Sequence, residues 1–373
     1  MKNKKIIIIA SAIFPFQSPR ANRATELAKE FGKQGHDVTI YGVLGDYDYS
    51  VFEAKNNVKV KNIEKMTFAT LNSDNSGKET FLNKILRRLL GRWLEFPNIE
   101  FMFKMTKILK KEKGTDMLIS IAYPHPIHWG CALAKARMGV KFPKLWVADC
   151  GDPYMGNPIE TPVFYFKYIE KWFCRNVDYI TIPIEEGRSA YYSDFRDKIK
   201  VIPQGFDFDL VRIDSKEPNN EVPTFIYSGV FYQGVRDPRV FLDYLSKVLI
   251  NFKFIIYTQS KDILEPYKSK LGEKLIIKDY VTREELLVEL AKADFLVNFE
   301  NGNAVQSPSK LIDYALAKRP IMSVSSFAID EDNIERFLKG DYSGKLEVHN
   351  IDQYDIRNVA DKFISLSSGD LLK

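Results

Sequence analysis

The sequence predicts an α/β protein built from two doubly wound domains, each a parallel sheet covered by helices. The chain has 373 residues, about the length of two domains of roughly 180 residues each. Short apolar runs alternate with amphipathic stretches twice along the chain. Residues 199–209 carry Pro and Gly between these two series and predict a hinge.

We expect the first domain to span residues 1–204. Ile6–Ile9 form a β-branched run that predicts a buried parallel strand and is short for the apolar core of a secretory signal. Apolar residues at helical spacing predict a helix over 22–34, and Gly35 ends it. Further strands are expected at 38–43, 117–121, 145–148 and 179–182.

The second domain is expected over residues 205–355, with a C-terminal helix in 356–373 that packs back on the first domain. Thr282 and Glu285 form a capping box that predicts a helix start. Strands are expected at 224–228, 252–257, 295–298 and 321–324, and helices at 238–248, 282–293 and 308–317. In such folds, ligands bind at the carboxyl ends of the strands, here in a cleft between the domains.

Composition and charge narrow the class of protein. Hydrophobic residues make up 45% and charged residues 28%, which excludes a mainly disordered or fibrous chain. Three cysteines without CxxC spacing argue against a disulfide framework or zinc site and favour a cytoplasmic protein. Residues 1–205 hold 32 basic and 22 acidic residues, a net charge of +10, whereas the remaining 22 basic and 27 acidic residues give −5. The first half therefore suits an anionic partner or surface.

The segment 306–314 is the strongest local signal for ligand binding. Ser307 and Pro308 are favoured at a helix start, where free backbone N–H groups of Ser309, Lys310 and Leu311 could hold a diphosphate. Asp313, one turn further, could accept ribose hydroxyls. An ordinary capped helix with solvated charges is the alternative.

A second candidate phosphate loop is residues 227–237. Gly229 and Gly234 would let a phosphate approach the backbone, and Arg236 could grip it. A tight turn with an Arg236–Asp237 surface pair is the alternative.

Residues 145–154 place Asp149 and Asp152 at the end of a predicted strand, where general bases and substrate clamps usually lie. A simple Asp-Pro turn is the alternative.

His125 and His128 follow another strand and predict a polar wall of the site rather than a metal site. The pairs Asp46/Asp48 and Asp207/Asp209 imitate a metal-binding DxD, but their context is weak, and we expect no metal or other cofactor.

Residues 84–113 are basic and amphipathic. Leucines and Trp93 interleave with the basic residues, a pattern shared by peripheral proteins on anionic lipid and by ordinary solvated helices. The basic residues are Lys84, Arg87, Arg88, Arg92, Lys104, Lys107, Lys110, Lys111 and Lys113. No nucleic-acid-binding motif accompanies them, so nucleic acid is not an expected partner.

Taken in order, four segments resemble the GT-B glycosyltransferases of the retaining family GT4. They are residues 35–39 (GHDVT), 146–154 (WVADCGDPY), 201–207 (VIPQGFD) and 307–314 (SPSKLIDY) followed by Pro320. The resemblance extends from Lys5 to about Val324. It implies two Rossmann-like domains facing an inter-domain cleft, with a nucleotide-sugar donor bound by the C-terminal domain and an acceptor by the N-terminal one.

The resemblance also implies roles for individual residues. Asp152, Asp149 and His125 would position donor and acceptor, and the loop Phe16, Gln17, Ser18 and Arg20 would touch the donor phosphate and the acceptor. The candidate donor-binding residues are Gly229, Arg236, Gln306, Ser307, Ser309, Lys310, Leu311 and Asp313.

The sequence departs from the family pattern at four places. Val305 and Asp313 replace the two glutamates of the family's E-x7-E motif. Cys150-Gly151 stands where Phe-Arg is common, which removes a cation beside Asp152. Val230 stands where a second phosphate-binding cation is expected.

The resulting expectation is a retaining, metal-independent glycosyltransferase of bacterial polysaccharide or glycolipid assembly. The acceptor would be a saccharide or a polyprenyl-linked saccharide, and the basic half would suit the inner face of the plasma membrane. A nucleotide-sugar 2-epimerase and a degenerate, non-catalytic nucleotide- or glycan-binding scaffold are the alternatives. A dinucleotide dehydrogenase is disfavoured because no GxGxxG follows the first strand.

Overall fold

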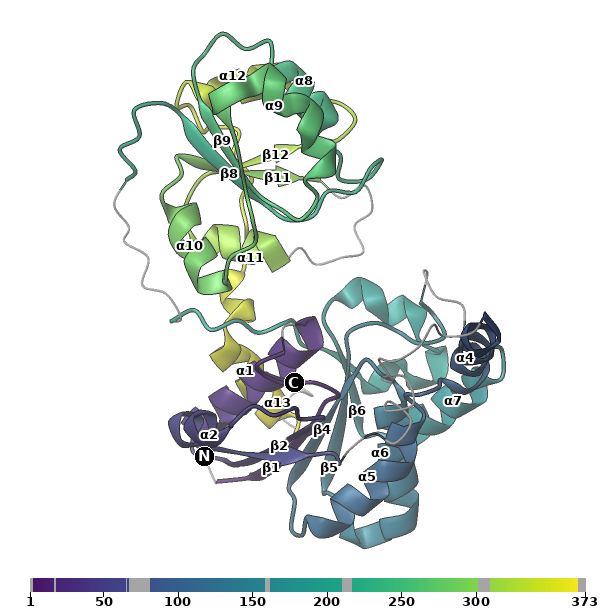
Figure 1. The fold of residues 1–373 in the computed structure, drawn as a ribbon. Helices are drawn as coiled ribbons and strands as arrows, with labels where there is room; N and C mark the ends of the chain where they lie inside the picture. The colour runs from purple at the N-terminus through teal and green to yellow at the C-terminus, as the bar shows by residue number, and fades with distance from the viewer. Residues whose placement is uncertain are drawn as a thin grey trace. The chain divides into compact units, whose positions relative to one another are not determined.

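The computed structural model describes residues 3–16, 18–64, 66, 81–157, 162–209, 217–300 and 309–367, with the backbone alone for 81–87 and 309. The chain divides into two compact units, Met1–Phe206 with Tyr354–Lys373, and Asp207–Gln353. Both units are α/β, with helices packed on parallel sheets (Figure 1). This confirms the predicted fold class.

The first unit contains a seven-stranded sheet of order β3-β2-β1-β4-β5-β6-β7. Its strands are β1 Lys5–Ile9, β2 Asp37–Gly42, β3 Val58–Asn62, β4 Met117–Ala122, β5 Leu145–Cys150, β6 Tyr179–Ile182 and β7 Ile199–Val201. Its helices are α1 Pro19–Lys33, α2 Ser50–Asn56, α4 Phe81–Leu94, α5 Glu100–Lys111, α6 Pro126–Met138, α7 Phe166–Asn176 and α13 Ile356–Ser365. The 3-10 turns are η1 Gly139–Lys141, η2 Glu185–Ala190, η3 Ser193–Lys198 and η6 Ile351–Tyr354, the last spanning the return to this unit.

Strand β1 pairs in parallel with both β2 and β4, so helices can cover both of its faces. The isoleucines 6–9 are accordingly fully buried, as expected for a central parallel strand. Helix α1 begins at Pro19, three residues before the predicted start, because the Ser18 hydroxyl accepts the Ala21 N–H (3.2 Å) and caps the helix.

Helix α13 returns to the first unit and packs beside α1 (Figure 1). Its apolar face, with Val359 and Phe363, shares a core with Ala24 and Leu27 of α1. The Arg23 guanidinium lies 5.1 Å from the centre of the Phe363 ring.

The second unit contains a five-stranded sheet of order β10-β9-β8-β11-β12. Its strands are β8 Thr224–Ser228, β9 Lys253–Tyr257, β10 Leu275–Lys278, β11 Phe295–Phe299 and β12 Ile321–Val324. Its helices are α8 Arg239–Leu245, α9 Glu265–Leu271, α10 Arg283–Ala291, α11 Ser309–Leu316 and α12 Glu331–Leu338, with short 3-10 turns η4 Asp262–Leu264 and η5 Gly272–Lys274. The predicted capping box at Thr282 and Glu285 is present at the start of α10.

Candidate functional site

The first group of predicted site residues lies at the carboxyl edge of the first sheet. Strands β1, β4 and β5 are neighbours in this sheet. Phe16 follows β1, His125 follows β4 and Asp152 follows β5, while Arg20 lies in the first turn of α1. The topology therefore gathers residues from three distant parts of the chain at one edge. Gln17 lies outside the described residues.

Asp149 is part of a buried ion pair. Its carboxylate accepts two hydrogen bonds from Arg23 (3.2 and 3.0 Å) and one from the Thr181 hydroxyl (2.7 Å). Burial acts to raise its pKa, but Arg23 and Arg20 outweigh burial and hold the pKa below its usual value. The Asp149 carboxylate is thus engaged by Arg23, Arg20 and Thr181 inside the unit.

Arg23 was missed by sequence reasoning. Besides Asp149, it donates to the backbone carbonyls of Ile202 (3.2 Å) and Pro203 (2.5 Å). This one buried guanidinium therefore joins α1, β5 and the segment that leads out of the first unit. An Arg among apolar residues on the inner face of a helix was the available signal, because buried charges in proteins are normally paired.

Arg20 lies against Gly151. A Cβ atom built on Gly151 would be 2.2 Å from the Arg20 Cζ, so the guanidinium occupies the space that a side chain at 151 would need. Arg20 also lies 3.7 Å from the Asp149 carboxylate. The family pattern has an arginine at position 151. Here the guanidinium of Arg20, which comes from α1, occupies the space beside Gly151 instead.

Asp152 and Phe16 are both exposed at this edge. No described residue forms a hydrogen bond or ion pair with the Asp152 carboxylate. Ser18, in contrast, is engaged as the cap of α1. Asp152 is therefore the carboxylate of the predicted pair that can contact a ligand.

His125 lies in a cluster of aromatic rings and is buried. Its ring centre is 4.9 Å from that of Tyr154, and burial lowers its pKa to about 4. His128 is engaged deeper in the core, with Nδ1 2.8 Å from the Ser120 hydroxyl and Nε2 3.4 Å from the Cys150 sulfur. His125 is therefore a neutral imidazole near pH 7, able to orient a ligand but not to serve as a cation.

The second group of predicted residues lies at the carboxyl end of β8. The Ser228 N–H donates to the Tyr314 hydroxyl (2.9 Å), which fixes α11 against this strand. Gly229 has φ +148°, and a Cβ there would be 2.9 Å from the Tyr227 hydroxyl, so this position requires glycine. Arg236 reaches back to the Val230 carbonyl (3.3 Å).

Lys310 is a buried amine in the first turn of α11. Its Nζ lies 4.7 Å from the centre of the Tyr227 ring and has no hydrogen-bond partner among the described residues. Burial, and to a lesser degree repulsion from Arg236, lowers the pKa of Lys310 to about 7. The predicted diphosphate cations therefore lie close enough to repel each other.

Asp313 is paired with Arg283 of α10, another residue missed by sequence reasoning. The Arg283 Nε and Nη2 lie 2.8 and 2.7 Å from Asp313 Oδ1. Burial raises the pKa of Asp313, and Arg283 opposes this rise. A ribose would thus meet a carboxylate already oriented by a guanidinium.

The remaining donor candidates are only partly described. Gln306, Ser307 and the departing Val305 lie outside the described residues, and Ser309 is described by its backbone as the first residue of α11. Leu311 packs against the apolar cluster beneath the helix. Its candidate contribution is confined to its backbone N–H.

The two DxD-like pairs form local turns. Asp48 accepts the Ser50 N–H (2.9 Å), and Asp207 accepts the Asp209 N–H (2.9 Å). Within the described ranges, no three His, Cys, Asp or Glu side chains gather as a metal site. None of the helices in those ranges has both the length and the hydropathy to cross a bilayer.

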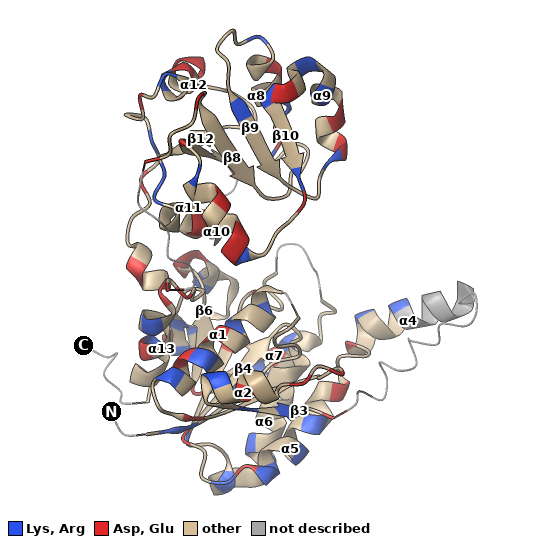
Figure 2. Ribbon diagram, turned by 60° about the vertical axis from the view of Figure 1, so that its left-hand side comes forward, with Lys and Arg blue, Asp and Glu red and all other residues tan. Residues whose placement is uncertain are grey.

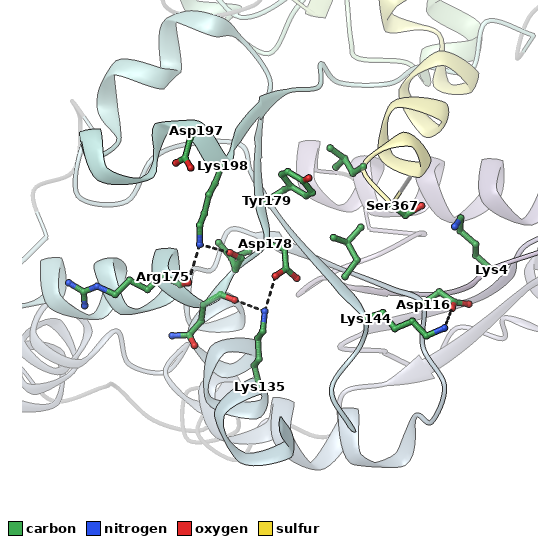
Figure 3. Close-up of a pocket in the computed structure, with 14 residues that line it drawn as sticks. Lys4, Asp116, Lys135, Lys144, Arg175, Asp178, Tyr179, Asp197, Lys198 and Ser367 are labelled. Atoms are coloured by element: carbon green, nitrogen blue, oxygen red, sulfur yellow. Dashed lines mark hydrogen bonds and ion pairs between the residues drawn. The ribbon is translucent and has the colours of Figure 1, made fainter. Parts of the chain in front are cut away.

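A cavity of about 880 Å³ lies at the opposite, amino-terminal edge of the first sheet (Figure 3). Three of its five lining cations are paired within the protein. Lys135 donates to the Asn176 carbonyl and to Asp178, Lys144 pairs with Asp116, and Lys198 donates to three carbonyls at the end of α7. These lysines bind backbone carbonyls at the end of α7 and carboxylates at the starts of strands. They therefore serve the fold, and we assign the cavity no ligand.

Solved structures share the fold over the whole chain. A glycosyltransferase from Rickettsia africae aligns with a TM-score of 0.67 and 13% identity, covering 100% of each chain. The lipopolysaccharide outer core galactosyltransferase WaaB aligns with a TM-score of 0.61 and 14% identity, covering 98% of this chain and 99% of WaaB. Anabaena HepE in complex with UDP aligns with a TM-score of 0.60 and 9% identity, covering 98% of this chain and 100% of HepE.

A search of curated protein sequences finds no match. The family model of Glycosyltransferase Family 4 matches residues 21–210, just over half of the chain. That match contains most of α1 with its buried Arg23, strand β5 with Asp149 and the loop with Asp152. The chain therefore belongs to Glycosyltransferase Family 4 and is a nucleotide-sugar glycosyltransferase with two Rossmann-like domains, the GT-B fold.

Proposed function

We propose that this protein transfers a sugar, with retention of anomeric configuration and without a metal ion, from a nucleoside-diphosphate donor to a saccharide acceptor. The acceptor would be free or polyprenyl-linked, in bacterial polysaccharide or glycolipid assembly at the cytoplasmic face of the membrane. The donor would bind the second unit and the acceptor the first.

The observation that carries this proposal is the cationic edge at β8 and α11. Lys310 and Arg236 lie near the same Tyr227 ring, and Lys310 lies in the first turn of α11, the helix end where the dipole favours an anion. An anion at this edge would relieve the repulsion between the two cations. A departing nucleoside diphosphate is such an anion, and fixed cations can stabilise its charge without a metal.

The solved relatives support this choice of ligand. HepE has been solved with UDP and with UDP-glucose. TarM has been solved with UDP and α-GlcNAc-glycerol, and a starch synthase catalytic domain with ADP and acarbose. All three have been solved with a nucleoside diphosphate, and TarM and the starch synthase also with a saccharide or glycoside.

In the first unit, Asp152 would contact the acceptor and orient its hydroxyl. His125, neutral because of its burial, would accept or donate a hydrogen bond without adding charge. Arg20, held against Gly151, would supply positive charge beside Asp152. Asp149 and Arg23 would fix Arg20 and the base of the loop.

A thermal-shift series with UDP, GDP, ADP and their sugar conjugates, each without and with Mg²⁺, tests donor binding. A ligand at 100 times its Kd adds about 2.7 kcal/mol of stability, so one nucleotide should stand out without metal. If no nucleotide moves the melting temperature, the donor assignment is wrong. Turnover of a nucleotide sugar without any acceptor would instead indicate an epimerase.

The stereochemistry has its own test. With the identified donor and a saccharide acceptor, proton NMR of the product should show the anomeric configuration of the donor. An inverted product would overturn the retaining assignment and leave donor binding intact.

A further inference from the structure

The first unit carries an exposed surface in which aromatic and basic side chains of two distant segments meet. We call it the aromatic–basic surface. It consists of Arg88, Leu89, Arg92, Trp93 and Leu94 of α4 with Phe164, Tyr165, Lys167, Tyr168 and Lys171 at the start of α7. Trp93 and Tyr165 have ring centres 6.4 Å apart, and the Tyr165 hydroxyl donates to the Trp93 carbonyl, so the two segments lie side by side.

The apolar part of this surface is exposed to solvent. Trp93 is 48% exposed, Phe164 is 68% and Tyr168 is 62%. Exposed apolar side chains that gather in one place, with basic residues among them, mark an interaction site rather than ordinary surface scatter.

The charges at this surface are of one sign. In the described residues 88–95 and 162–171, the cations are Arg88, Arg92, Lys167 and Lys171. Of the two carboxylates, Glu170 is buried and Glu95 is half-buried and accepts the Tyr154 hydroxyl. The Lys167 and Lys171 ammonium groups lie over the rings of Tyr168 (4.9 Å) and Tyr192 (4.7 Å) rather than beside carboxylates. The surface therefore attracts anions.

Helix α5, which follows α4 and is also basic, differs (Figure 2). Lys104 pairs with Glu100 (3.2 Å), and Lys107 and Lys111 pair with Glu64 (3.0 and 3.4 Å). Three of the cations in the predicted basic stretch 84–113 are thus neutralised. Arg88 and Arg92 of α4, in contrast, have no carboxylate partner among the described residues, and they lie beside α7, which the sequence pattern did not include.

We propose that the aromatic–basic surface docks on an anionic lipid bilayer, with Trp93, Phe164 and Tyr168 entering the headgroup region and the four cations contacting lipid phosphates. Each ring has an apolar body, and the indole and phenol also carry a polar group, which suits this boundary. The inference rests on the proposed function, because docking would bring the enzyme to an acceptor that is anchored in the membrane.

Two hydrogen bonds join the docking surface to the acceptor edge. The Tyr154 hydroxyl donates to Glu95, directly after α4 (2.8 Å), and Tyr154 is two residues from Asp152. Asn98 donates to the hydroxyl of Tyr123, which precedes His125 in the loop after β4 (3.0 Å). Docking thus places the loops of Asp152 and His125 next to the lipid-bound segment.

Sedimentation with vesicles tests the proposal. We expect the protein to bind vesicles of about 30 mol % phosphatidylglycerol in phosphatidylcholine at least about tenfold more tightly than phosphatidylcholine alone. A Trp93→Ser/Phe164→Ser variant should lose at least about tenfold in vesicle affinity. Arg88→Gln/Arg92→Gln should lose the preference for the anionic lipid.

Phe103→Ser and Lys107→Gln on α5 are matched controls, because Phe103 is 60% exposed and Lys107 is neutralised by Glu64. Both should bind vesicles as the unaltered protein does. Equal losses in the α5 variants, or equal binding to both lipids, would overturn the proposal. Every variant is also tested for nucleotide-induced thermal shift, so that a failure of docking is distinguished from a failure of the donor assignment.

Discussion

The carboxyl edges of the two sheets differ in how their charged side chains are paired. In the first unit, Asp149 is neutralised by Arg23 and Arg20, and His125 is buried in its neutral form. In the second unit, Lys310 and Arg236 lie near one ring, and Arg236 contributes to the lowered pKa of Lys310. The first edge is thus a preformed, charge-balanced frame, whereas the second holds repulsion that a bound diphosphate would relieve.

The largest effect is expected from breaking the frame of the first unit. Arg23→Met leaves Asp149 charged and buried, and this should lower the free energy of unfolding by about 3–5 kcal/mol. Denaturant titration measures the loss. Arg137→Met, at an exposed position on α6, should change it by less than about 0.5 kcal/mol. If the two variants behave alike, the pair does not stabilise the unit; Arg23→Met/Asp149→Leu should recover most of the loss.

The next effect concerns the second unit. Arg236→Ala should raise the Kd of the nucleoside diphosphate about 10- to 100-fold, because a charge-assisted hydrogen bond contributes about 1.5–3 kcal/mol. Calorimetric titration measures the Kd. Lys247→Ala removes an exposed cation from the same unit and should leave the Kd unchanged. An unaltered Kd in Arg236→Ala would refute the phosphate role.

A smaller effect tests the contact between Arg20 and Gly151. Gly151→Ala must displace the guanidinium, so kcat/KM should fall about tenfold while the nucleotide Kd stays the same. Adding Arg20→Ala should cause little further loss, because both changes remove one interaction. Gly187→Ala, where a Cβ meets only Ile182 at 3.7 Å, is the control. Additive losses would show that the two positions act independently.

The smallest effect is a pH dependence of donor affinity. Lys310 has a pKa of about 7 in this structure, so its amine is mostly neutral above pH 7. A diphosphate that binds there favours the protonated amine, so Lys310 must take up a proton on binding. The affinity for the donor should therefore fall as the pH rises. Between pH 7 and 9 the Kd of a nucleotide sugar, whose diphosphate does not titrate there, should rise up to about tenfold. Lys310→Met should abolish this slope. A slope that persists in that variant would place the proton elsewhere.

The sequence predicted the elements whose signals are local. The isoleucines 6–9 indicated a buried central strand, and Thr282 with Glu285 indicated the start of α10; both are present. Boundaries were less exact: α1 starts at Pro19 rather than 22, because the Ser18 cap extends it. Such signals survive folding because they depend on neighbours within one or two turns.

The sequence predicted several residues of the candidate site but not the ion pairs that they form. Sequence motifs selected Asp149, Asp152, Arg236 and Lys310, yet neither Arg23 nor Arg283 was identified as the partner of a selected carboxylate. Arg23 and Asp149 are 126 residues apart, and Arg283 and Asp313 are 30 apart on different helices. A single sequence carries no distance information over such separations.

By itself, the sequence determined the α/β class, the central strands of both sheets, and the motifs that resemble a glycosyltransferase. It did not predict strands β3, β7 and β10, and β7 opens the segment 199–209 that was expected to be a hinge. The tertiary structure decided which charges are neutralised. It turned Asp149 into a buried anchor, brought Arg20 into the space above Gly151 and separated the paired lysines of α5 from the exposed cations of α4. Local patterns depend on backbone geometry, whereas the state of a charge depends on burial and on neighbours that only the folded chain brings together.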